Sequence, residues 1–516
     1  MCLAFLLASI MAAAGAQAER RDERPVIRGT GEAADLRELF EGGVFEDLFG
    51  SAQSGPVLAN YEPSGFDYSR IDAERGRSIG IFRSTAFGLV SEPAINAYVN
   101  RVLQRILEYS PERPIPARAY VVADGSFGAA AAPDGAIFVN LGLIRDMESE
   151  DELAFILAHE LAHIIRRHHG SDWYVSAQRR ALVGAALAGD MAVELGQMVN
   201  QSLPGMENLQ TAILIGRILY EVSDVLVAPL FTREEEEEAD ILGLDLMIAA
   251  GYNMAAATTL LEKMAVWEDQ HAPPQAIKTE AEREREMSEA FLSQGLTGAM
   301  VVALSAFGDL FKAAKKELKK EHYPAAERIA TVQNYMLRFY LKDVPPPTTD
   351  LWWAKADPAA KGTLELFDNY DAAKAAYAAL NDGDLKLAET KARIAVSGTT
   401  KHDAYPRLAF YSVRKRQGRK PLAMKNLELA QRGSEPSLML YKALLDEATA
   451  AKDWAGAVLL IEEARLNLAD SPFLLPYQIQ IYRQTGRQKE TPSLLLKCTM
   501  EYPELVDRCK AAAGQR

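Results

Sequence analysis

Apolar residues are distributed unevenly along this chain of 516 residues. Residues 19–75 are rich in charge, Gly and Ser and show no sustained apolar period, which predicts a flexible leader. The apolar density rises at Ile79 and stays high to about Leu341, so a folded domain is predicted over residues 76–343. Three consecutive prolines within residues 344–350 cannot continue a helix, and this stretch is therefore predicted to be a stiff linker.

Beyond the linker, residues 351–516 contain an internal repeat of small residues. One set recurs at intervals of 35, 34 and 34 positions, and a second set follows the first by seven positions. Small residues seven apart on one helix let a partner helix approach closely, and a period of about 34 residues is typical of helix-turn-helix arrays. The first set is Ala388, Ala423, Ala457 and Thr491, the second is Ala395, Ala430, Ala464 and Cys498, and five positions before the first set stand Gly383, Gly418, Lys452 and Gly486.

This period resembles that of tetratricopeptide repeats and predicts an α-solenoid in residues 351–516. Such arrays stack into a curved surface that holds a peptide or a protein partner, and they carry no chemistry themselves. The alternative is an irregular helical domain in which the spacing of the alanines is a coincidence.

Both ends of the chain carry a further signal. The first 18 residues are uncharged, contain an apolar stretch and end in the small-x-small sequence Ala16-Gln17-Ala18. This pattern predicts a signal peptide that is cleaved after Ala18 and exports the chain, although no Lys or Arg precedes the apolar stretch. Cleavage would leave two cysteines, Cys498 and Cys509, which are a candidate disulfide in an oxidising compartment or, alternatively, two buried thiols.

Composition and charge exclude several classes of protein. With 48% hydrophobic and 25% charged residues, the chain is neither collagen-like, nor wholly disordered, nor a polytopic membrane protein. A net charge of −14 argues against a nucleic-acid binder and in favour of protein or peptide partners. The uncharged run from Phe291 to Gly308 reaches the lower length limit of a spanning helix, but its polar residues favour a buried helix, with a peripheral membrane contact as the alternative.

The segment from Ser149 to His163 indicates the chemistry of the protein. Ser149 and Glu152 form a predicted capping box, so a helix should begin there. His159 and His163 are four residues apart, and their imidazoles therefore project from one helix face and can bind one Zn²⁺. Glu160, beside the first histidine, can accept a proton from water at that metal. This is the H-E-x-x-H pattern of zinc peptidases, set among apolar residues that would bury the helix.

A catalytic zinc needs a third protein ligand, and the sequence offers two candidates. His169 stands where metzincins have their third histidine, but Arg166 replaces the glycine at which that pattern turns, so the helix has no obvious reason to break. The rival is the acidic run 234–238. Glu236 and Asp240 are four apart on a predicted helix, so one could bind zinc while the other orients a ligating histidine. Spacing alone does not choose Glu236 over the neighbouring glutamates.

Three blocks, in this order, resemble metallopeptidase family forty-eight, which includes HtpX and the CAAX prenyl proteases. They are Gly135 to Leu143, Ser149 to His168, and Glu236 to Asp240 with Gly243. The resemblance implies a mainly α fold with a small β-sheet and a gluzincin metalloprotease domain that holds one Zn²⁺ per chain. It also implies that Glu236 is the third ligand, as the first residue of an E-x-x-A-D pattern, and that Asp240 supports a ligand from the second sphere.

A later block, His322 to Arg328, resembles the family's T-H-P-x-x-x-x-R segment, although its proline stands one place late. In some periplasmic members this histidine reaches the zinc, so the resemblance makes His322 a candidate inhibitory fourth ligand and Arg328 a supporting residue. A second departure lies in Ser126 to Pro133, whose alanines replace the family's Asn-Ala-Phe type segment. An exposed strand edge there could still pair with an extended peptide, in a cleft with little side-chain discrimination.

The signal peptide and the repeats make the chain most similar to the periplasmic branch of the family. The expected function is an exported endopeptidase that cleaves misfolded or stalled envelope proteins, with repeats that recruit a substrate or a protein partner. The alternative is a chaperone-like or scaffold protein whose metal site is latent. A third hypothesis, a metzincin-like site with His169, predicts that replacing Glu236 leaves zinc binding intact.

Overall fold

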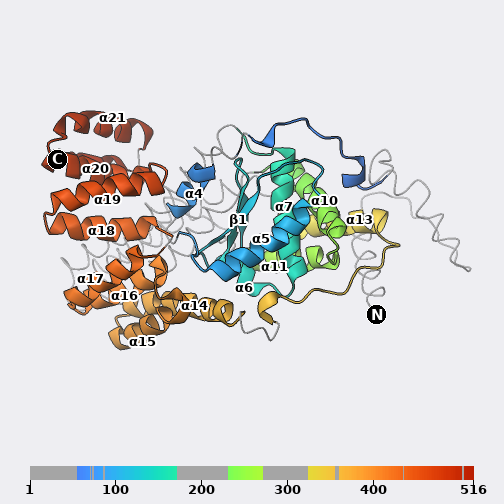
Figure 1. Cartoon of the computed structure of the whole chain (residues 1–516), viewed down its shortest axis with the longest axis horizontal. Coiled ribbons are helices and arrows are strands. Elements are labelled where there is room, and N and C mark those ends of the chain that lie inside the picture. Colours follow the sequence, from blue (N-terminus) through green and yellow to red (C-terminus); the bar gives the residue numbers. More distant parts are fainter. Residues whose placement is uncertain are drawn as a thin grey trace, which may run out of the picture. The chain divides into compact units, whose positions relative to one another are not determined.

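The computed structural model describes residues 55–69, 71, 75–84, 88–170, 231–270, 324–354, 360–433, 435–502 and 505–515. All elements discussed below belong to the unit Pro56–Arg516 (Figure 1). The predicted signal peptide, the run from Phe291 to Gly308 and His322 lie outside the described residues. None of the described helices combines the length and the apolar character that a membrane-spanning segment requires.

The N-terminal half combines helices with a small sheet, as expected. Within the described part of the chain, strand β3 lies between β1, which is parallel to it, and β2, which is antiparallel, so β2 is an edge strand of this three-stranded sheet. The strands are β1 (Arg118–Val122), β2 (Ala129–Ala131) and β3 (Ala136–Asn140), and the helices are α4 (Arg75–Arg83), α5 (Pro93–Leu107), α6 (Leu141–Asp146), α7 (Glu150–Arg166), α10 (Arg233–Ala249), α11 (Ala255–Gln270) and α13 (Ala325–Phe339).

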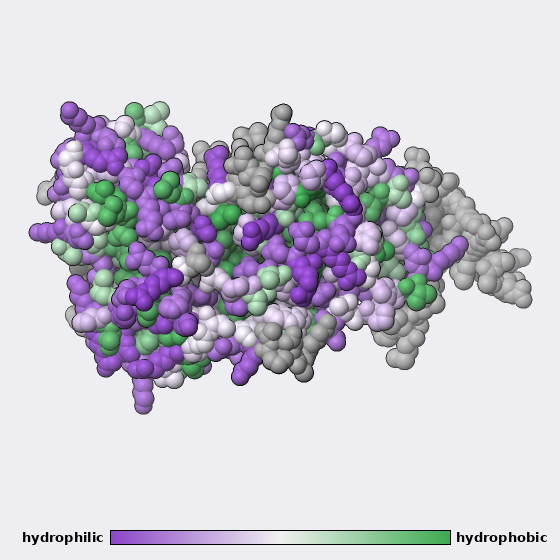
Figure 2. All heavy atoms as spheres, in the orientation of Figure 1, coloured by the Kyte–Doolittle hydropathy of each residue, from purple (hydrophilic) through white to green (hydrophobic). Residues whose placement is uncertain are grey.

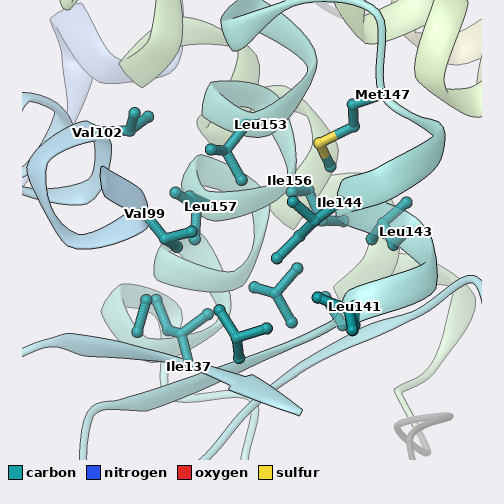
Figure 3. Packing of buried hydrophobic residues seen from close by; sticks show 14 of the residues in the cluster. Val99, Val102, Ile137, Leu141, Leu143, Ile144, Met147, Leu153, Ile156 and Leu157 are labelled. Atoms are coloured by element: carbon teal, nitrogen blue, oxygen red, sulfur yellow. The ribbon is translucent and has the colours of Figure 1, made fainter. Parts of the chain in front are cut away.

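Helix α7 is the central element of this half, because every residue from Asp151 to Ile165 is buried. Figure 3 shows apolar side chains of α7, such as Leu157, converging with residues of α5, α6 and β3. Burial of each such side chain contributes about 1.5–3 kcal/mol. The apolar residues that flank the histidine motif therefore hold it in the core.

The predicted start of α7 is confirmed, but the predicted capping box is only half formed. The Ser149 hydroxyl accepts a hydrogen bond from the Glu152 amide at 3.2 Å. The Glu152 side chain does not bond back to Ser149; it accepts from the Glu148 amide at 2.9 Å and pairs with Lys263 of α11 at 2.9 Å. Glu152 thus links α7 to α11. This contact was not predictable from the position of Glu152 in the sequence.

The end of the predicted leader, residues 56–69, docks on the folded domain. The Leu58 amide donates to Asp245 at 2.8 Å, and the buried Tyr68 hydroxyl donates to the backbone oxygen of Ile165 at 3.0 Å. These contacts join segments that are distant in sequence. The composition of residues 19–75 therefore predicted more freedom than residues 56–69 have.

The proline-containing linker also follows the surface of the domain. The Thr349 amide donates to Asp151 at 2.6 Å, and the Glu150 amide donates to the Thr349 oxygen at 2.9 Å. Asn253 donates to the Pro346 oxygen at 2.9 Å. The linker is therefore pinned to the beginning of α7, and a buried apolar cluster continues past it into the helices that follow.

The C-terminal half is helical, and successive helices pack in pairs: α14 with α15, α16 with α17, α18 with α19, and α20 with α21. The helices are α14 (Lys361–Asn381), α15 (Leu385–Ala395), α16 (Ala404–Arg416), α17 (Lys420–Gln431), α18 (Leu438–Ala450), α19 (Trp454–Asn467), α20 (Leu475–Gln484), α21 (Thr491–Glu501) and α22 (Val506–Ala513). Both sets of recurring small residues lie on the second helix of these pairs, and all eight side chains are buried.

The turn inside each pair repeats as well. The four residues that precede the first small set, including Lys452, all have positive φ angles, between 58° and 77°. Glycine adopts this conformation without a steric cost, and Lys452 is the exception. Cys498 and Cys509 form a disulfide that joins α21 to α22.

On the face seen in Figure 2, the C-terminal half is mostly hydrophilic, with scattered apolar patches. The second helices α19 and α21 expose large apolar side chains, with Leu466 85% and Met500 74% exposed. The two halves touch through α4 and its neighbours. Arg83 pairs with Glu435 at 2.8 Å, and Ser84 donates to the Leu468 oxygen at 3.0 Å.

Candidate metal centre

Helix α7 presents His159 and His163 side by side. Their Nε2 atoms lie 3.1 Å apart, close to the roughly 3.4 Å separation of two nitrogens that bind one tetrahedral Zn²⁺. Glu236 of α10 completes the group, with Oε2 3.5 Å from His159 Nε2 and Oε1 3.9 Å from His163 Nε2. All three side chains are buried, and their candidate ligand atoms lie within 4.8 Å of one another.

The structure distinguishes the glutamates that spacing could not. Glu235 forms a reciprocal capping box with Thr232 at the start of α10. Glu237 pairs with Arg233 one turn earlier, at 3.3 Å. Glu236 alone of these three is buried against the histidines, so the geometry favours it as the third ligand.

Helix α10 reaches the histidines because Gly243 lets it approach α7 closely. A Cβ atom at Gly243 would lie 2.8 Å from both the backbone nitrogen and Cα of His159. Real side chains do not tolerate such a distance. The absence of a side chain at Gly243 therefore lets the face of α10 that carries Glu236 and Asp240 pack against His159 and His163.

Asp240, to which the resemblance assigned a supporting role, contacts His159. The His159 Nδ1 atom lies 3.0 Å from Asp240 Oδ1. Arg328 of α13 donates from Nε and Nη2 to the two oxygens of the same carboxylate, at 2.8 and 2.6 Å, and its Nη1 lies 3.2 Å from Glu236 Oε2. Arg328, which the sequence offered as a supporting residue, is thus buried between both carboxylates.

His163 has neighbours that sequence reasoning missed. Its Nδ1 atom lies 2.9 Å from Nδ1 of His168, and its ring stacks on Phe231 with a centroid distance of 3.7 Å. His168 reaches back because α7 does break after Arg166, contrary to the expectation from the sequence. Arg167 adopts a left-handed conformation with φ 59°, so no glycine is needed at the turn.

His169 is not part of the group that could hold a metal among the described residues. It lines a cavity of about 270 Å³ together with Tyr68 and Pro133, beside the end of α7. The geometry therefore favours Glu236 over the metzincin-like alternative. His322 lies outside the described residues, and its inhibitory role stays a prediction.

Glu160 has the environment of a general base. Burial raises the pKa of its carboxyl to about 7; His159 and Arg328 oppose this change and Glu236 adds to it. The backbone of Ala131, on the edge strand β2, hydrogen-bonds the Glu160 carboxylate. A base that titrates near pH 7 can both accept and return a proton under neutral conditions.

The residues present fit a divalent cation in charge and in geometry. Although burial opposes ionisation, Arg328 holds the pKa values of Glu236 and Asp240 below their usual range. Burial and Arg328 also oppose protonation of His159, yet hydrogen bonds to Asp240 and Glu236 raise its pKa to about 9. The site thus favours a positive charge. Glu160 Oε2 is buried and makes no hydrogen bond among the described residues, so it is available to a bound group. Glu236 Oε2 is also buried, and it lies 3.2 Å from Arg328 Nη1 and 3.5 Å from His159 Nε2.

Comparison with known proteins identifies the class to which this site belongs. Residues 93–336 match the model of Peptidase family M48. This stretch contains the residues of the site, so this part of the chain is a member of that family, and the resemblance seen in the sequence is confirmed.

Individual relatives match the same region. A putative beta-barrel assembly-enhancing protease of Vibrio cholerae is 25% identical over 34% of this chain and 34% of its own length. The beta-barrel assembly-enhancing protease of Yersinia pestis is 24% identical over 46% of this chain and 50% of its own length. The mitochondrial metalloendopeptidase OMA1 of Schizosaccharomyces pombe is 31% identical over 34% of this chain and 45% of its own length. The chain therefore matches between a third and a half of the length of these relatives.

Proposed function

We propose that this protein is a zinc-dependent endopeptidase of the gluzincin type. The observation that carries the proposal is the convergence of His159, His163 and Glu236 within 4.8 Å, with Glu160 next to the first histidine. These three residues would hold one Zn²⁺ per chain, with Asp240 as the support of His159. Membership of the M48 family and the names of the relatives support the same conclusion.

A zinc ion in this site would act as a Lewis acid that polarises the scissile carbonyl and lowers the pKa of water. Glu160 removes the proton from the attacking water and returns it to the leaving amine. Arg328 keeps Asp240 ionised and in place, so that Asp240 can accept the Nδ1 proton of His159. The lone pair at His159 Nε2 then remains for the metal.

The substrate would bind as an extended peptide along β2. Among the described residues, β2 pairs with β3 alone, and its residue Ala131 contacts Glu160. A peptide that adds to the sheet at β2 would gain main-chain hydrogen bonds and would pass close to the base. The alanines of β2 offer few side-chain features, which fits a peptidase with broad specificity.

The C-terminal helix pairs would recruit the substrate or a protein partner as tetratricopeptide-like repeats. The buried small residues and the repeated turn conformation support this assignment. The exposed apolar residues on α19 and α21 could bind unfolded clients, which also favours the second candidate, a chaperone-like protein with a latent metal site. The predicted signal sequence and the names of the bacterial relatives support an activity in the periplasm, on misfolded or stalled envelope proteins.

The test measures zinc content and casein cleavage in the wild-type chain and two matched variants. We expect about one zinc per chain in all of them. Glu160→Gln should lower cleavage about 10²–10⁴-fold, the usual contribution of a general base. Glu237→Gln, a neighbouring change on α10 at a residue that does not face the histidines, should cleave at the wild-type rate. Zinc binding without cleavage by any form would instead support the chaperone-like function.

Two further variants examine the remaining alternatives. Glu236→Ala should lose zinc and His169→Ala should keep it; the reverse result would establish the metzincin-like site. His322→Ala should raise cleavage if His322 is an inhibitory ligand and should leave the rate unchanged if it is a surface residue.

A further inference from the structure

The two ligand histidines have different partners at the nitrogen that faces away from the metal. His159 Nδ1 faces the Asp240 carboxylate at 3.0 Å, an arrangement common in zinc sites. Among the described residues, His163 Nδ1 faces no carboxylate; it faces Nδ1 of His168 at 2.9 Å. A histidine pair is an unusual support for a ligand, because each ring nitrogen can be either donor or acceptor.

We propose that His168 is a positioning residue for the metal: its Nδ1 accepts the Nδ1–H of His163 and so leaves the His163 Nε2 lone pair to the zinc. The inference rests on the zinc site of the proposed function. His168 belongs neither to the H-E-x-x-H pattern nor to the acidic segment that supplies Glu236, so this role extends the proposed zinc site by one residue.

The direction of this hydrogen bond follows from the other neighbour of His168. His168 Nε2 lies 3.4 Å from Glu238 Oε2, and a carboxylate can only accept. His168 therefore carries its proton on Nε2, and its Nδ1 is an acceptor. Two nitrogens 2.9 Å apart share one proton, so that proton belongs to His163 Nδ1. In this hydrogen-bond chain His163 Nδ1–H donates to His168 Nδ1, and His168 Nε2–H donates to Glu238.

The local fold is built to hold this geometry. The left-handed Arg167 turns the chain at the end of α7, and the His168 amide donates to the His163 oxygen at 3.1 Å. The His168 side chain is only 6% exposed. Phe231 covers the face of the His163 ring, so the ring is fixed by stacking while its tautomer is fixed by His168.

His169 provides a matched control. It is the adjacent residue, it is also mostly shielded from solvent, and its ring lies 5.5 Å from Phe231, but it is not within the candidate metal group. A change there disturbs the same turn without removing the acceptor of the His163 proton.

The experiment compares the zinc dissociation constants of the full chain and three variants by competition with a chelator. His168→Leu should weaken zinc binding about 10–100-fold, the usual effect of losing such a partner. His168→Asn, whose amide oxygen can stand in for Nδ1, should recover affinity to within a few-fold of wild type. His169→Leu should bind like wild type. Absorption of the Co²⁺-loaded chain should shift for His168→Leu and not for His169→Leu.

The outcomes separate this inference from the function on which it rests. If the wild-type chain binds no zinc, the zinc site itself is wrong. If the wild-type chain binds zinc and His168→Leu binds it within twofold, or if His168→Asn is as weak as His168→Leu, the positioning role is wrong. A second measurement needs no variant: ¹⁵N spectra of histidines in the zinc-loaded wild-type chain should show His163 protonated at Nδ1 and His168 at Nε2. The opposite tautomers would overturn the inference.

Discussion

The candidate metal centre and the interiors of the C-terminal helix pairs are both buried, but their buried side chains differ in chemistry. At the centre, ionised and polar groups from three helices contact one another, and Arg328 pairs with both Asp240 and Glu236. In the helix pairs, the recurring buried positions hold small side chains, such as Ala457 and Ala464, at intervals that repeat along the chain.

This difference predicts which properties of the protein change when a single residue is replaced. Buried charges are tolerated only when paired, so removing one partner leaves the others uncompensated. Stacked helix pairs contribute through nearest-neighbour contacts that roughly add. A change at the metal centre should therefore affect stability and metal binding together, whereas a change in the helix pairs should affect stability alone.

Arg328→Met should produce the largest effect. The variant leaves the carboxylates of Asp240 and Glu236 buried without their shared cation, and the metal-free chain should lose about 3–5 kcal/mol of unfolding free energy. Arg338→Met, on the same helix but partly exposed and stacked on Phe339, should cost about 1 kcal/mol or less. Urea denaturation of both variants tests this, and equal losses would mean that burial of the charge network carries no special cost.

Removal of the disulfide should destabilise the C-terminal helices and leave the candidate metal centre unchanged. Cys498 and Cys509 are 11 residues apart, and chain entropy assigns such a link about 2–3 kcal/mol. The double change to alanine keeps a small residue at the buried position 498. We expect faster hydrogen exchange in α20 to α22 and an unchanged zinc dissociation constant. Weaker zinc binding would show that the two regions are not independent.

Gly243→Ala should lower both the stability of the fold and the affinity for zinc. The added Cβ would lie 2.8 Å from the backbone of His159, so α7 and α10 must separate, at a cost of about 1–3 kcal/mol. Because the separation moves Glu236 away from the histidines, zinc should bind more weakly as well. Gly76→Ala, where no atom lies within 4 Å of the added carbon, is the control and should change neither quantity. Tight zinc binding by Gly243→Ala would refute the close-approach argument.

Glu389→Gln should give the smallest effect, visible only through pH. Hydrogen bonds from Gln417 and Arg393 and the charge of Arg414 lower the pKa of Glu389 to about 2. Since the pKa is lower in the folded chain than its ordinary value of 4.5, this stabilisation is present above pH 4.5 and is lost as the pH falls towards 2. Wild type and variant should differ in unfolding free energy at pH 7 and converge near pH 2. A difference independent of pH would point to packing instead.

Particular residues show how far the sequence predicts the site. Ser149 caps α7 as expected, and the two histidines lie on one face as their spacing required. The choice among the glutamates, the contact of His168 with His163 and the stacking of Phe231 were not predictable from spacing. His168 could have been noticed as a third histidine just past the motif, but the left-handed Arg167 that turns it back has no sequence signature.

The sequence by itself determined what depends on near neighbours along the chain: where α7 begins, which histidines share a face, and the period of buried small residues in the helix pairs. Only the tertiary structure decided which groups meet from different elements. Spacing fixes the direction of a side chain on its own helix, but the partner of that side chain depends on how closely and in which register two helices pack. In this protein the packing of α10 against α7 depends on the lack of a side chain at Gly243 and on the ion pair between Asp240 and Arg328 of α13.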